Sequence, residues 1–273
     1  MALYVVATPI GNIEDITLRA LKVLKDVGLI AAEDTRHTKK LLAHYGIGTP
    51  VTSYYEHNER EKAPYLLERL KGGVDMALVS DAGTPGISDP GYRLIRLACE
   101  EGVRVISVPG PSALMAVLSI AGLPTDEFTF RGFMPARQAE RRRFLAELKG
   151  ADSTFVMYES PRRLKAALDD IKAILADAEV AVGREITKLH EEVIRGTVDR
   201  VIGELAGRDV KGEVTVVLRT GKKAPADGET LSSELREMLS AGVPLKDAVK
   251  AVASALGMPK SMVYKEALKY KGS

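Results

Sequence analysis

The sequence is poor in cysteine, with Cys99 as the only thiol among 273 residues. A single cysteine excludes a disulfide framework and a zinc cluster built on cysteine ligands. Cys99 falls in a stretch with helical spacing of apolar residues, and we expect it to be an inert thiol in the core. The four histidines have no metal-ligand spacing, and the motif H-E-x-x-H is absent. The sequence therefore points away from metal and thiol chemistry.

Long apolar runs are also missing. The longest apolar stretches have the length of a strand or the periodicity of a helix, and none reaches the roughly 18 residues of a membrane span. Residues 1–9 lack the basic start and the small-residue cleavage site of a secretory signal. Glycine and proline are scattered, which excludes collagen-like and low-complexity classes. We expect a cytoplasmic globular protein with no membrane contact.

A marked excess of one charge is the third absence. The 39 Lys and Arg residues face 37 Asp and Glu residues, so the formal charge is +2. This balance argues against a histone-like nucleic-acid binder but allows a local basic face. Residues 222–273 carry nine basic and six acidic side chains, a net charge of +3. Residues 137–149, preceded by Arg131, are a second basic segment, either a contact for phosphate groups or a solvated helix face.

The first part of the chain alternates strand-like and helix-like patterns. Strands are predicted at 3–7, 29–32, 51–54, 76–80 and 103–108. Helices are predicted between and after them, at 16–27, 35–44, 59–70, 91–101 and 112–122. This alternation predicts an α/β fold with a mainly parallel sheet and helices on both faces.

From Phe128 onward the strands follow one another more closely, which predicts a mixed or partly antiparallel sheet. Strands are predicted at 128–132, 153–158, 180–184, 193–197 and 213–218, with helices at 137–148, 161–175 and 198–205. Gly, Pro and acidic residues break the pattern at 122–127. We therefore expect two α/β domains, at 1–122 and 123–220.

The last segment, 221–273, begins with a predicted linker at 221–229. Three short helices follow at 231–240, 245–256 and 260–269. The last two have the sequence shape of a helix-turn-helix. A small helical bundle that packs on the main body is the alternative interpretation.

Three loops rich in Gly, Pro, Ser, Thr and Asp follow predicted strands, at 8–12, 80–91 and 109–113. In parallel α/β sheets, ligands bind at the carboxyl ends of the strands, so these loops predict a binding cleft. No G-x-G-x-x-G follows the first strand, and no G-x-x-x-x-G-K-[ST] occurs, which argues against dehydrogenase-type and P-loop sites. The absence of G-x-S-x-G weakens an α/β-hydrolase interpretation.

Charged clusters occur at 33–40, 159–163 and 183–188. In the second cluster, Ser160 is a good N-cap and Pro161 a good first helical residue, so capping alone accounts for these two. Capping does not account for Glu159, Arg162 and Arg163. The charged side chains in these clusters are either functional or simply solvated.

Taken together, the loops resemble a known family. The segments LYVVATPIGN (3–12), AEDTR (32–36), VSDAGTPGISDPG (79–91) and VPGPSA (108–113) are similar to the tetrapyrrole-methylase superfamily. The segments ESPRR (159–163), GREITKLHEE (183–192) and GEVTVV (212–217) extend the resemblance. Within the superfamily, the chain most resembles the bacterial small-subunit ribosomal RNA cytidine 2′-O-methyltransferases, whose extra helical segment its tail resembles.

The resemblance implies a non-Rossmann methyltransferase fold of two α/β domains with a small C-terminal helical segment. It further implies a homodimer, S-adenosylmethionine as methyl donor between the domains, and no metal. Carried over by position, the residues that bind the donor are Pro9, Ile10, Asp81, Thr84, Ile87, Ser112, Ala113, Tyr158, Arg184 and Thr215. The family's usual Gly-Asp-Pro is replaced by Ser80-Asp81-Ala82, so Asp81 transfers more safely than its neighbours.

The reaction implied by the resemblance is attack of a ribose 2′-oxygen on the sulfonium methyl group. The acceptor would be a cytidine in the decoding region, in free small-subunit ribosomal RNA or in the assembled subunit. Positioning supplies much of such catalysis, and a general base helps to remove the hydroxyl proton. The hypothesis for the base is Asp34, Glu159 or Glu185, with orienting roles for Arg36, Arg162 and Lys188.

Two rival interpretations remain at this point. A tetrapyrrole or corrin methyltransferase of the same superfamily is the first, but the basic segments and the extra helical tail count against it. The second is a nucleoside-sensing DNA-binding regulator, which rests on the tail alone. It leaves the loops of both predicted domains unexplained.

Overall fold

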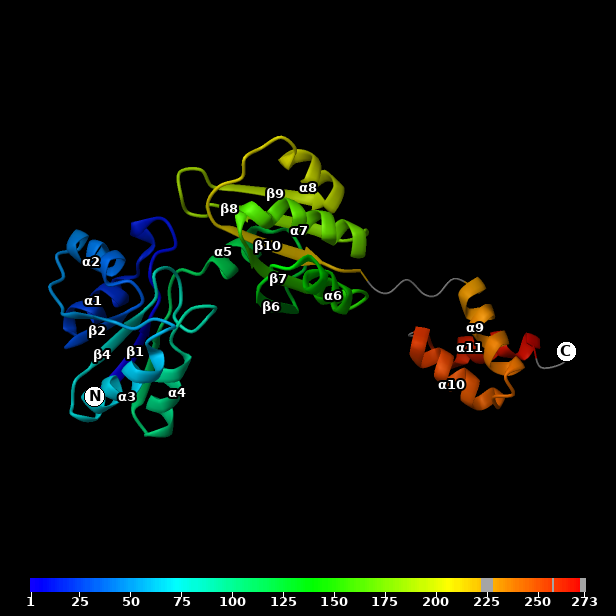
Figure 1. Ribbon diagram of the computed structural model, residues 1–273, viewed down its shortest axis with the longest axis horizontal. Coiled ribbons are helices and arrows are strands. Elements are labelled where there is room, and N and C mark those ends of the chain that lie inside the picture. Colours follow the sequence, from blue (N-terminus) through cyan, green and yellow to red (C-terminus); the bar gives the residue numbers. More distant parts are fainter. Residues whose placement is uncertain (222–227, 257, 271–273) are drawn as a thin grey trace.

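The computed structural model describes residues 1–221, 228–256 and 258–270, which form two five-stranded sheets and a C-terminal group of helices (Figure 1). Residues 222–227 of the predicted linker lie outside the described residues, and Gly228 already begins a helix. In the described part of the chain, no helix is both long and apolar enough to cross a membrane.

The first sheet contains β1 (Ala2–Val6), β2 (Leu29–Ala32), β3 (Val51–Ser53), β4 (Met76–Val79) and β5 (Arg104–Val108). Its order is β3-β2-β4-β1-β5, and every pair is parallel, which confirms the predicted parallel sheet. Because parallel strands all end at the same edge, the loops at 8–12, 80–91 and 109–113 lie along one side of this sheet.

Helices cover both faces of the first sheet, as the sequence predicts. α1 (Leu18–Asp26) and α2 (Thr35–His44) pack on one face, whereas α3 (Glu59–Lys71) and α4 (Tyr92–Glu100) pack on the other. In β4, Met76 and Leu78 join the core of α3 and α4, and the alternate residues join the core of α1 and α2. Burial on both faces explains the continuous apolar character of β1, β2 and β4.

The second sheet contains β6 (Phe128–Phe133), β7 (Thr154–Glu159), β8 (Glu179–Arg184), β9 (Glu192–Thr197) and β10 (Val214–Arg219). Its order is β6-β7-β10-β8-β9. β6 and β7 are parallel, and the other pairs are antiparallel. The prediction of a mixed sheet is thus confirmed.

The two faces of the second sheet have different partners. α6 (Gln138–Leu148), α7 (Pro161–Ile174) and α8 (Val198–Leu205) pack on one face. α5 (Ala113–Ile120) follows β5 of the first sheet in sequence but packs on the opposite face of the second (Figure 1). A Cβ on Gly183 would lie 2.6 Å from Cγ2 of Val117, so the close approach of α5 requires glycine there. The predicted division of the chain at residue 122 stays a prediction.

The C-terminal group consists of α9 (Gly228–Ser240), α10 (Leu245–Leu256) and α11 (Lys260–Ala267). Their buried apolar side chains share one core, to which Leu235 and Val252 of α9 and α10 and Val263 of α11 contribute. The last helix is shorter than the sequence predicts, because it ends at Ala267 and a 3-10 turn (Leu268–Tyr270) follows.

The expectation for Cys99 is wrong. Cys99 is exposed on α4, whose buried residues are Leu94 and Ala98. Successive residues on a helix are turned by about 100°, so the residue next to Ala98 faces away from the core. The helix was predicted correctly, but its buried stripe lies one position from the thiol.

Candidate functional site

A cavity of about 310 Å³ lies where loops of the first sheet meet the ends of β7, β8 and β10. We call it the first cavity, and its volume is in the range of small-molecule sites. Most of the residues predicted to bind the methyl donor line it: Ile10, Thr84, Ile87, Ser112, Ala113, Tyr158 and Thr215. Segments far apart in the sequence are therefore brought together as the loop motifs predict.

Three adjacent strands of the second sheet supply one wall. Thr215 of β10 lies opposite Tyr158 of β7 and opposite Gly183 of β8. Side chains alternate along a strand, so these three positions share the face that does not hold the main core. The Tyr158 ring contacts Phe130 and Phe133 edge to face, with centroids 5.1 and 5.4 Å apart. Burial raises the pKa of Tyr158, so the ring forms a neutral wall.

The loops after β1 and β4 form the opposite wall and are tied to each other. The Thr8 amide donates to the Gly83 carbonyl at 2.9 Å, and the Gly83 amide donates back to the Thr8 carbonyl at 3.0 Å. The Thr8 hydroxyl donates to the Ser80 carbonyl at 3.1 Å. Gly83 has a φ of +79°, a left-handed conformation that favours glycine. This clamp holds Ile10 and Thr84 at the same cavity.

The amino end of α5 lies at the edge of the first cavity. Ser112 is the N-cap of α5, and its hydroxyl accepts from the Met115 amide at 3.5 Å. Ser112 and Ala113 are half-buried in the cavity wall. The motif VPGPSA thus combines a helix cap with a place on the cavity wall.

Asp89 also lines the first cavity, although it is not among the residues predicted from the sequence. Burial, together with the nearby carboxylates of Glu33 and Asp81, raises the pKa of Asp89 to about 6. Burial likewise raises the pKa of Glu33. The sequence signal for Asp89 is its position in the segment 79–91, which also holds three predicted donor residues.

Three predicted donor residues do not line the first cavity. Pro9 and Asp81 line a second, neighbouring cavity. Asp81 Oδ1 accepts from the Asp34 amide at 2.9 Å, so Asp81 joins the loops after β2 and β4. Arg184 lines neither cavity, because its guanidinium points away and Nε donates to Glu192 Oε2 at 3.3 Å. We leave Arg184 out of the proposed donor site.

Among the predicted catalytic residues, Asp34 and Arg36 form a local cap and line neither cavity. Asp34 caps α2 by accepting from the Arg36 amide at 2.8 Å, and its carboxylate pairs with Arg36 Nη2 at 2.7 Å. The hydrogen bond from the Arg36 side chain holds the pKa of Asp34 well below its usual range. The Asp34 carboxylate is therefore engaged in capping α2 and in pairing with Arg36.

Glu185 and Lys188 are bound to each other. Glu185 Oε1 accepts from Lys188 Nζ at 2.9 Å and from the Glu213 amide at 3.0 Å. The hydrogen bond from Lys188 lowers the pKa of Glu185. Lys188 lines the second cavity, whereas Glu185 lines neither. Glu185 is therefore better suited to hold Lys188 in place than to accept a proton.

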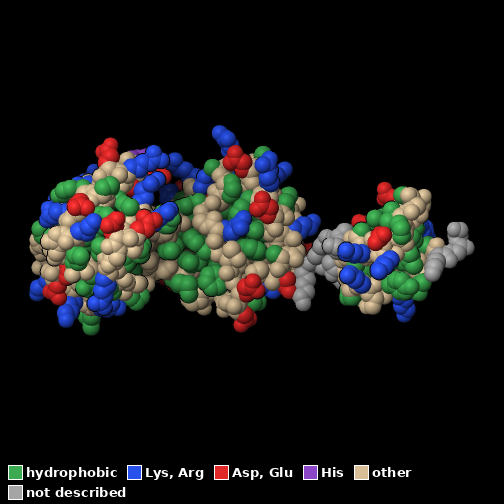
Figure 2. Space-filling view, turned by 90° about the horizontal axis from the view of Figure 1, so that it is seen from below, with side chains coloured by type: hydrophobic (Ala, Val, Ile, Leu, Met, Phe, Trp, Pro, Cys, Tyr) green, Lys and Arg blue, Asp and Glu red, His purple; other side chains and the backbone are tan. Residues whose placement is uncertain are grey.

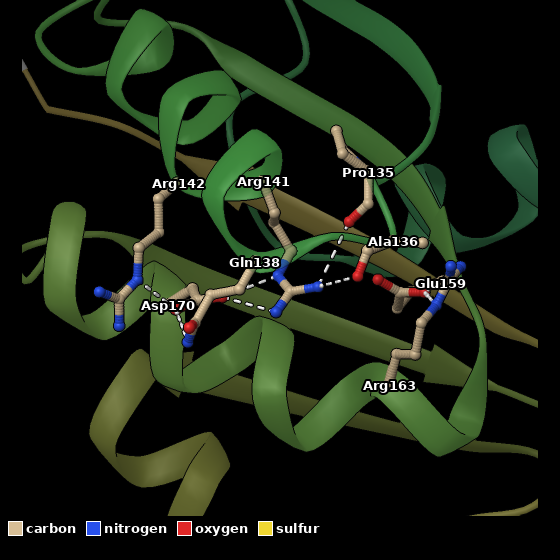
Figure 3. A network of polar contacts seen from close by, with 8 residues as sticks. All are labelled: Pro135, Ala136, Gln138, Arg141, Arg142, Glu159, Arg163 and Asp170. Carbon is tan, nitrogen blue, oxygen red and sulfur yellow. Dashed lines mark hydrogen bonds and ion pairs between the residues drawn. The ribbon is translucent and has the colours of Figure 1, made fainter.

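Glu159 differs from the other candidate carboxylates because it is fully buried and lines the first cavity. Its Oε1 accepts from the Ser160 amide at 2.6 Å and pairs with Arg163 Nη2 at 2.7 Å (Figure 3). Its Oε2 has no hydrogen-bond partner in the described part of the chain. A buried acceptor without a partner is costly, so a donor group on a bound ligand would be favoured at this atom.

The Arg-rich segment is less available to RNA than the sequence predicts. Arg141 is 3% exposed, and its Nη2 lies 2.6 Å from Asp170 Oδ2 (Figure 3). Its Nη1 donates to the carbonyls of Pro135 and Ala136 at 3.3 and 3.2 Å. The interpretation of this segment as a phosphate contact is therefore wrong for Arg141, which ties α6 to α7.

No group of three or more His, Cys, Asp or Glu residues within 1–221, 228–256 and 258–270 is arranged to hold a metal ion. Within these ranges, the first cavity is built from the motif loops, one buried carboxylate and one aromatic wall. Such a lining fits a small organic ligand held by backbone and apolar contacts.

Comparison with known proteins places the chain in a family. The family model for tetrapyrrole (corrin/porphyrin) methylases matches residues 2–202, and that for the RsmI C-terminal HTH domain matches residues 225–271. The ribosomal RNA small subunit methyltransferase I of Pseudomonas aeruginosa is 45% identical, over 99% of this chain and 98% of that protein. Its counterpart from Halalkalibacterium halodurans is 44% identical, over 96% of this chain and 93% of that protein.

Solved structures are similar in fold. Diphthine synthase matches with a TM-score of 0.61 at 16% identity, over 80% of this chain and 90% of that one. The uroporphyrin-III C-methyltransferase of Thermus thermophilus, solved with S-adenosylhomocysteine, matches with a TM-score of 0.55 at 18% identity. The match covers 80% of this chain and 97% of that one. The chain belongs to the tetrapyrrole methylase family and, within it, to the group of the ribosomal RNA small subunit methyltransferases I.

Proposed function

We propose that this chain methylates the 2′-oxygen of a cytidine ribose in the decoding region of small-subunit ribosomal RNA, with S-adenosylmethionine as methyl donor. One observation carries the proposal: a chain that resembles its relatives over nearly its whole length brings seven predicted donor residues into one cavity. Mapping of methylated riboses in small-subunit RNA, with and without the protein, tests it.

The first cavity is the proposed donor site. The described residues that line it include Asp89, Glu159 and Glu213 but no Lys, Arg or His. Negative side chains favour a cationic sulfonium ligand, and the aromatic wall around Tyr158 offers it apolar contacts. S-adenosylmethionine would supply the electrophilic methyl group when bound.

In the proposed reaction, the ribose 2′-oxygen forms a bond to the methyl carbon while the carbon–sulfur bond breaks. The hydroxyl proton passes to a base, and S-adenosylhomocysteine and the methylated ribose are the products. Of the three carboxylates considered from the sequence, only Glu159 lines the first cavity. We therefore assign Glu159 the role of hydrogen-bond acceptor or base, with Oε2 as the acting atom.

Asp89 is a second candidate for the base. It lines the same cavity, and a pKa raised to about 6 is near the value that favours proton transfer at neutral pH. Glu159→Gln and Asp89→Asn, assayed for methyl transfer with donor affinity measured separately, distinguish the two. The carboxylate that serves as base is the one whose loss slows transfer while donor binding persists.

The rival function is tetrapyrrole or corrin methylation, because the fold neighbours include uroporphyrin-III C-methyltransferases. Those likenesses are below 25% identity and concern the fold alone. Methyl-transfer assays on small ribosomal subunits and on tetrapyrroles separate the two. A DNA-binding regulator would instead bind duplex DNA sequence-specifically without methyl transfer.

The C-terminal helices are proposed to bind the RNA or the surface of the small subunit. On α11, Met262 and Tyr264 are 55% and 46% exposed, beside the exposed Lys260 and Lys265. Exposed basic and aromatic side chains on one short helix suit contacts with phosphates and unstacked bases. We propose that the enzyme consists of two α/β domains, at 1–122 and 123–220, followed by this C-terminal segment.

We further propose that the protein is a homodimer that acts in the cytoplasm, where its ribosomal substrate would be found. Large apolar side chains are exposed on α5 and β6, among them Met115, Phe128 and Phe133. Figure 2 shows hydrophobic side chains gathered on the part of the molecule that holds the second sheet, beside its junction with the part that holds the first. Molar mass in solution, measured by light scattering, tests the dimer.

A further inference from the structure

The second cavity, of about 440 Å³, lies beside the proposed donor site. The two cavities share Ile10, Ala82 and Glu213 as lining residues, so they adjoin. α2 forms one side of the second cavity, and Lys188 from the loop after β8 forms another. A ligand in the second cavity would therefore lie next to the donor.

The α2 side of this cavity is basic. His37, Lys40 and His44 all line it, and their spacing of three and four residues places them on one helix face. All three are exposed, and α2 contains no acidic residue. Thr38 and Leu41, which also line the second cavity, are buried beside this face, and their packing fixes the rotation of α2. Among the described residues, no acidic side chain forms a salt bridge with Lys40.

Lys188 is held at the cavity by a contact between loops of the two sheets. The Asn12 amide donates to Thr187 Oγ1 at 3.0 Å, which fastens the loop after β8 to the loop after β1. A Cβ on Gly11 would lie 2.8 Å from Thr187 Oγ1 and would also meet the Lys188 side chain. Glycine at this position thus lets Lys188 pass into the second cavity.

The two cavities differ in charge, because the charged side chains of the first are all carboxylates, whereas the second has both basic and acidic side chains. Asp89, Glu159 and Glu213 are the charged residues that line the first cavity, whereas His37, Lys40, His44 and Lys188 line the second, with Asp81 and Glu213 as its acidic members. Figure 2 shows Lys, Arg and His side chains gathered at the rim of the hollow between the two α/β lobes. A cationic donor suits the first cavity, and an anionic ligand suits the second.

We propose that the second cavity binds the phosphodiester backbone of RNA beside the acceptor nucleotide, with His37, Lys40 and His44 as the α2 contacts. This inference rests on the proposed function and specifies how its substrate is held. Phosphate contacts set the register of a nucleic acid on a protein without reading its sequence. A backbone anchored here would present the neighbouring ribose toward the adjoining donor cavity.

The chain offers a matched pair of lysines for the test. Lys39 and Lys40 are adjacent, basic and exposed on α2, but only Lys40 lines the second cavity. The variants are Lys40→Ala, His44→Ala, the double variant, and Lys39→Ala as the control. Binding of a decoding-region RNA fragment is measured over a series of salt concentrations, and donor affinity is measured in parallel by calorimetry.

We expect Lys40→Ala to weaken RNA binding by about 3- to 10-fold and to reduce the salt slope by roughly 1, because one phosphate contact is lost. Lys39→Ala should change RNA affinity by less than about twofold, and donor affinity should stay unchanged in every variant. Equal losses in Lys39→Ala and Lys40→Ala would overturn the site, as would unchanged RNA binding in the double variant or a fall in donor affinity.

The two proposals fail separately. Wild-type protein that binds the RNA but does not methylate it contradicts the proposed function. Normal methyl transfer and RNA affinity in Lys40→Ala/His44→Ala contradict the phosphate site and leave the proposed function standing.

Discussion

Arg141 and Asp170 form a buried ion pair, with Arg141 Nη2 2.6 Å from Asp170 Oδ2 and both side chains at most 4% exposed. Removing one partner of such a pair leaves an uncompensated buried charge. We therefore predict that Asp170→Ala lowers the free energy of unfolding by about 3–5 kcal/mol, measured by urea denaturation. Arg142→Ala is the comparison, because Arg142 contacts the same carboxylate but is 49% exposed, and should cost less than about 1 kcal/mol.

Gly183 is predicted to be intolerant of a side chain. Gly183→Ala would place Cβ 2.6 Å from Cγ2 of Val117 on α5, and such overpacking costs roughly 1–3 kcal/mol. Because Gly183 also lines the first cavity, donor affinity should fall with stability. Val117→Ala should restore part of both losses, and failure of this rescue would refute the contact. Gly203→Ala on α8 has open space and is the control.

The half-buried Asp89 predicts a dependence of stability on pH. Its pKa rises on folding from about 3.8 to about 6, so folding favours the protonated form. The stability that this group contributes is complete below the unfolded pKa and is lost as the pH rises through about 6. In the ligand-free protein, Asp89→Asn should therefore be more stable than wild type at pH 7.5, by roughly 1 kcal/mol after solvent screening. This advantage should disappear near pH 4, and an equal advantage at both pH values would contradict it.

Glu159 is predicted to matter for methyl transfer more than Asp34. Glu159→Gln keeps the size of the side chain but removes the charge beside the first cavity, and we expect methyl transfer to fall by about 10²- to 10⁴-fold if Oε2 takes the proton. Asp34→Asn should change the rate by less than about tenfold, because Asp34 acts through the cap of α2. The measurement is single-turnover transfer, with donor affinity determined for each variant. Equal rates for Glu159→Gln and wild type would exclude the assigned role.

Much of the fold follows from local sequence patterns. The local patterns predict all ten strands of the two sheets, and most clearly β2 and β4, which are buried on both faces and apolar throughout. The place of α5 does not follow from them. Its pattern predicts a helix after β5, but does not predict that the helix covers the second sheet, where Val117 contacts Gly183.

The site was predictable where the motifs are loops at strand ends. The clamp between Thr8 and Gly83 brings the predicted residues Ile10 and Thr84 to one cavity. Side-chain roles were harder to predict. Arg141 reads as a surface cation because its partner Asp170 is 29 residues away and belongs to another helix. Asp89 gives no sign in the sequence that burial and neighbouring carboxylates raise its pKa.

The most direct test of the central claim is mass spectrometric mapping of methylated riboses in small-subunit ribosomal RNA, incubated with S-adenosylmethionine and this protein. We expect one methyl group on the 2′-oxygen of a decoding-region cytidine, which depends on the protein and is strongly reduced with Glu159→Gln. Absence of ribose methylation on free RNA and on assembled subunits, by protein that binds the donor, would contradict it.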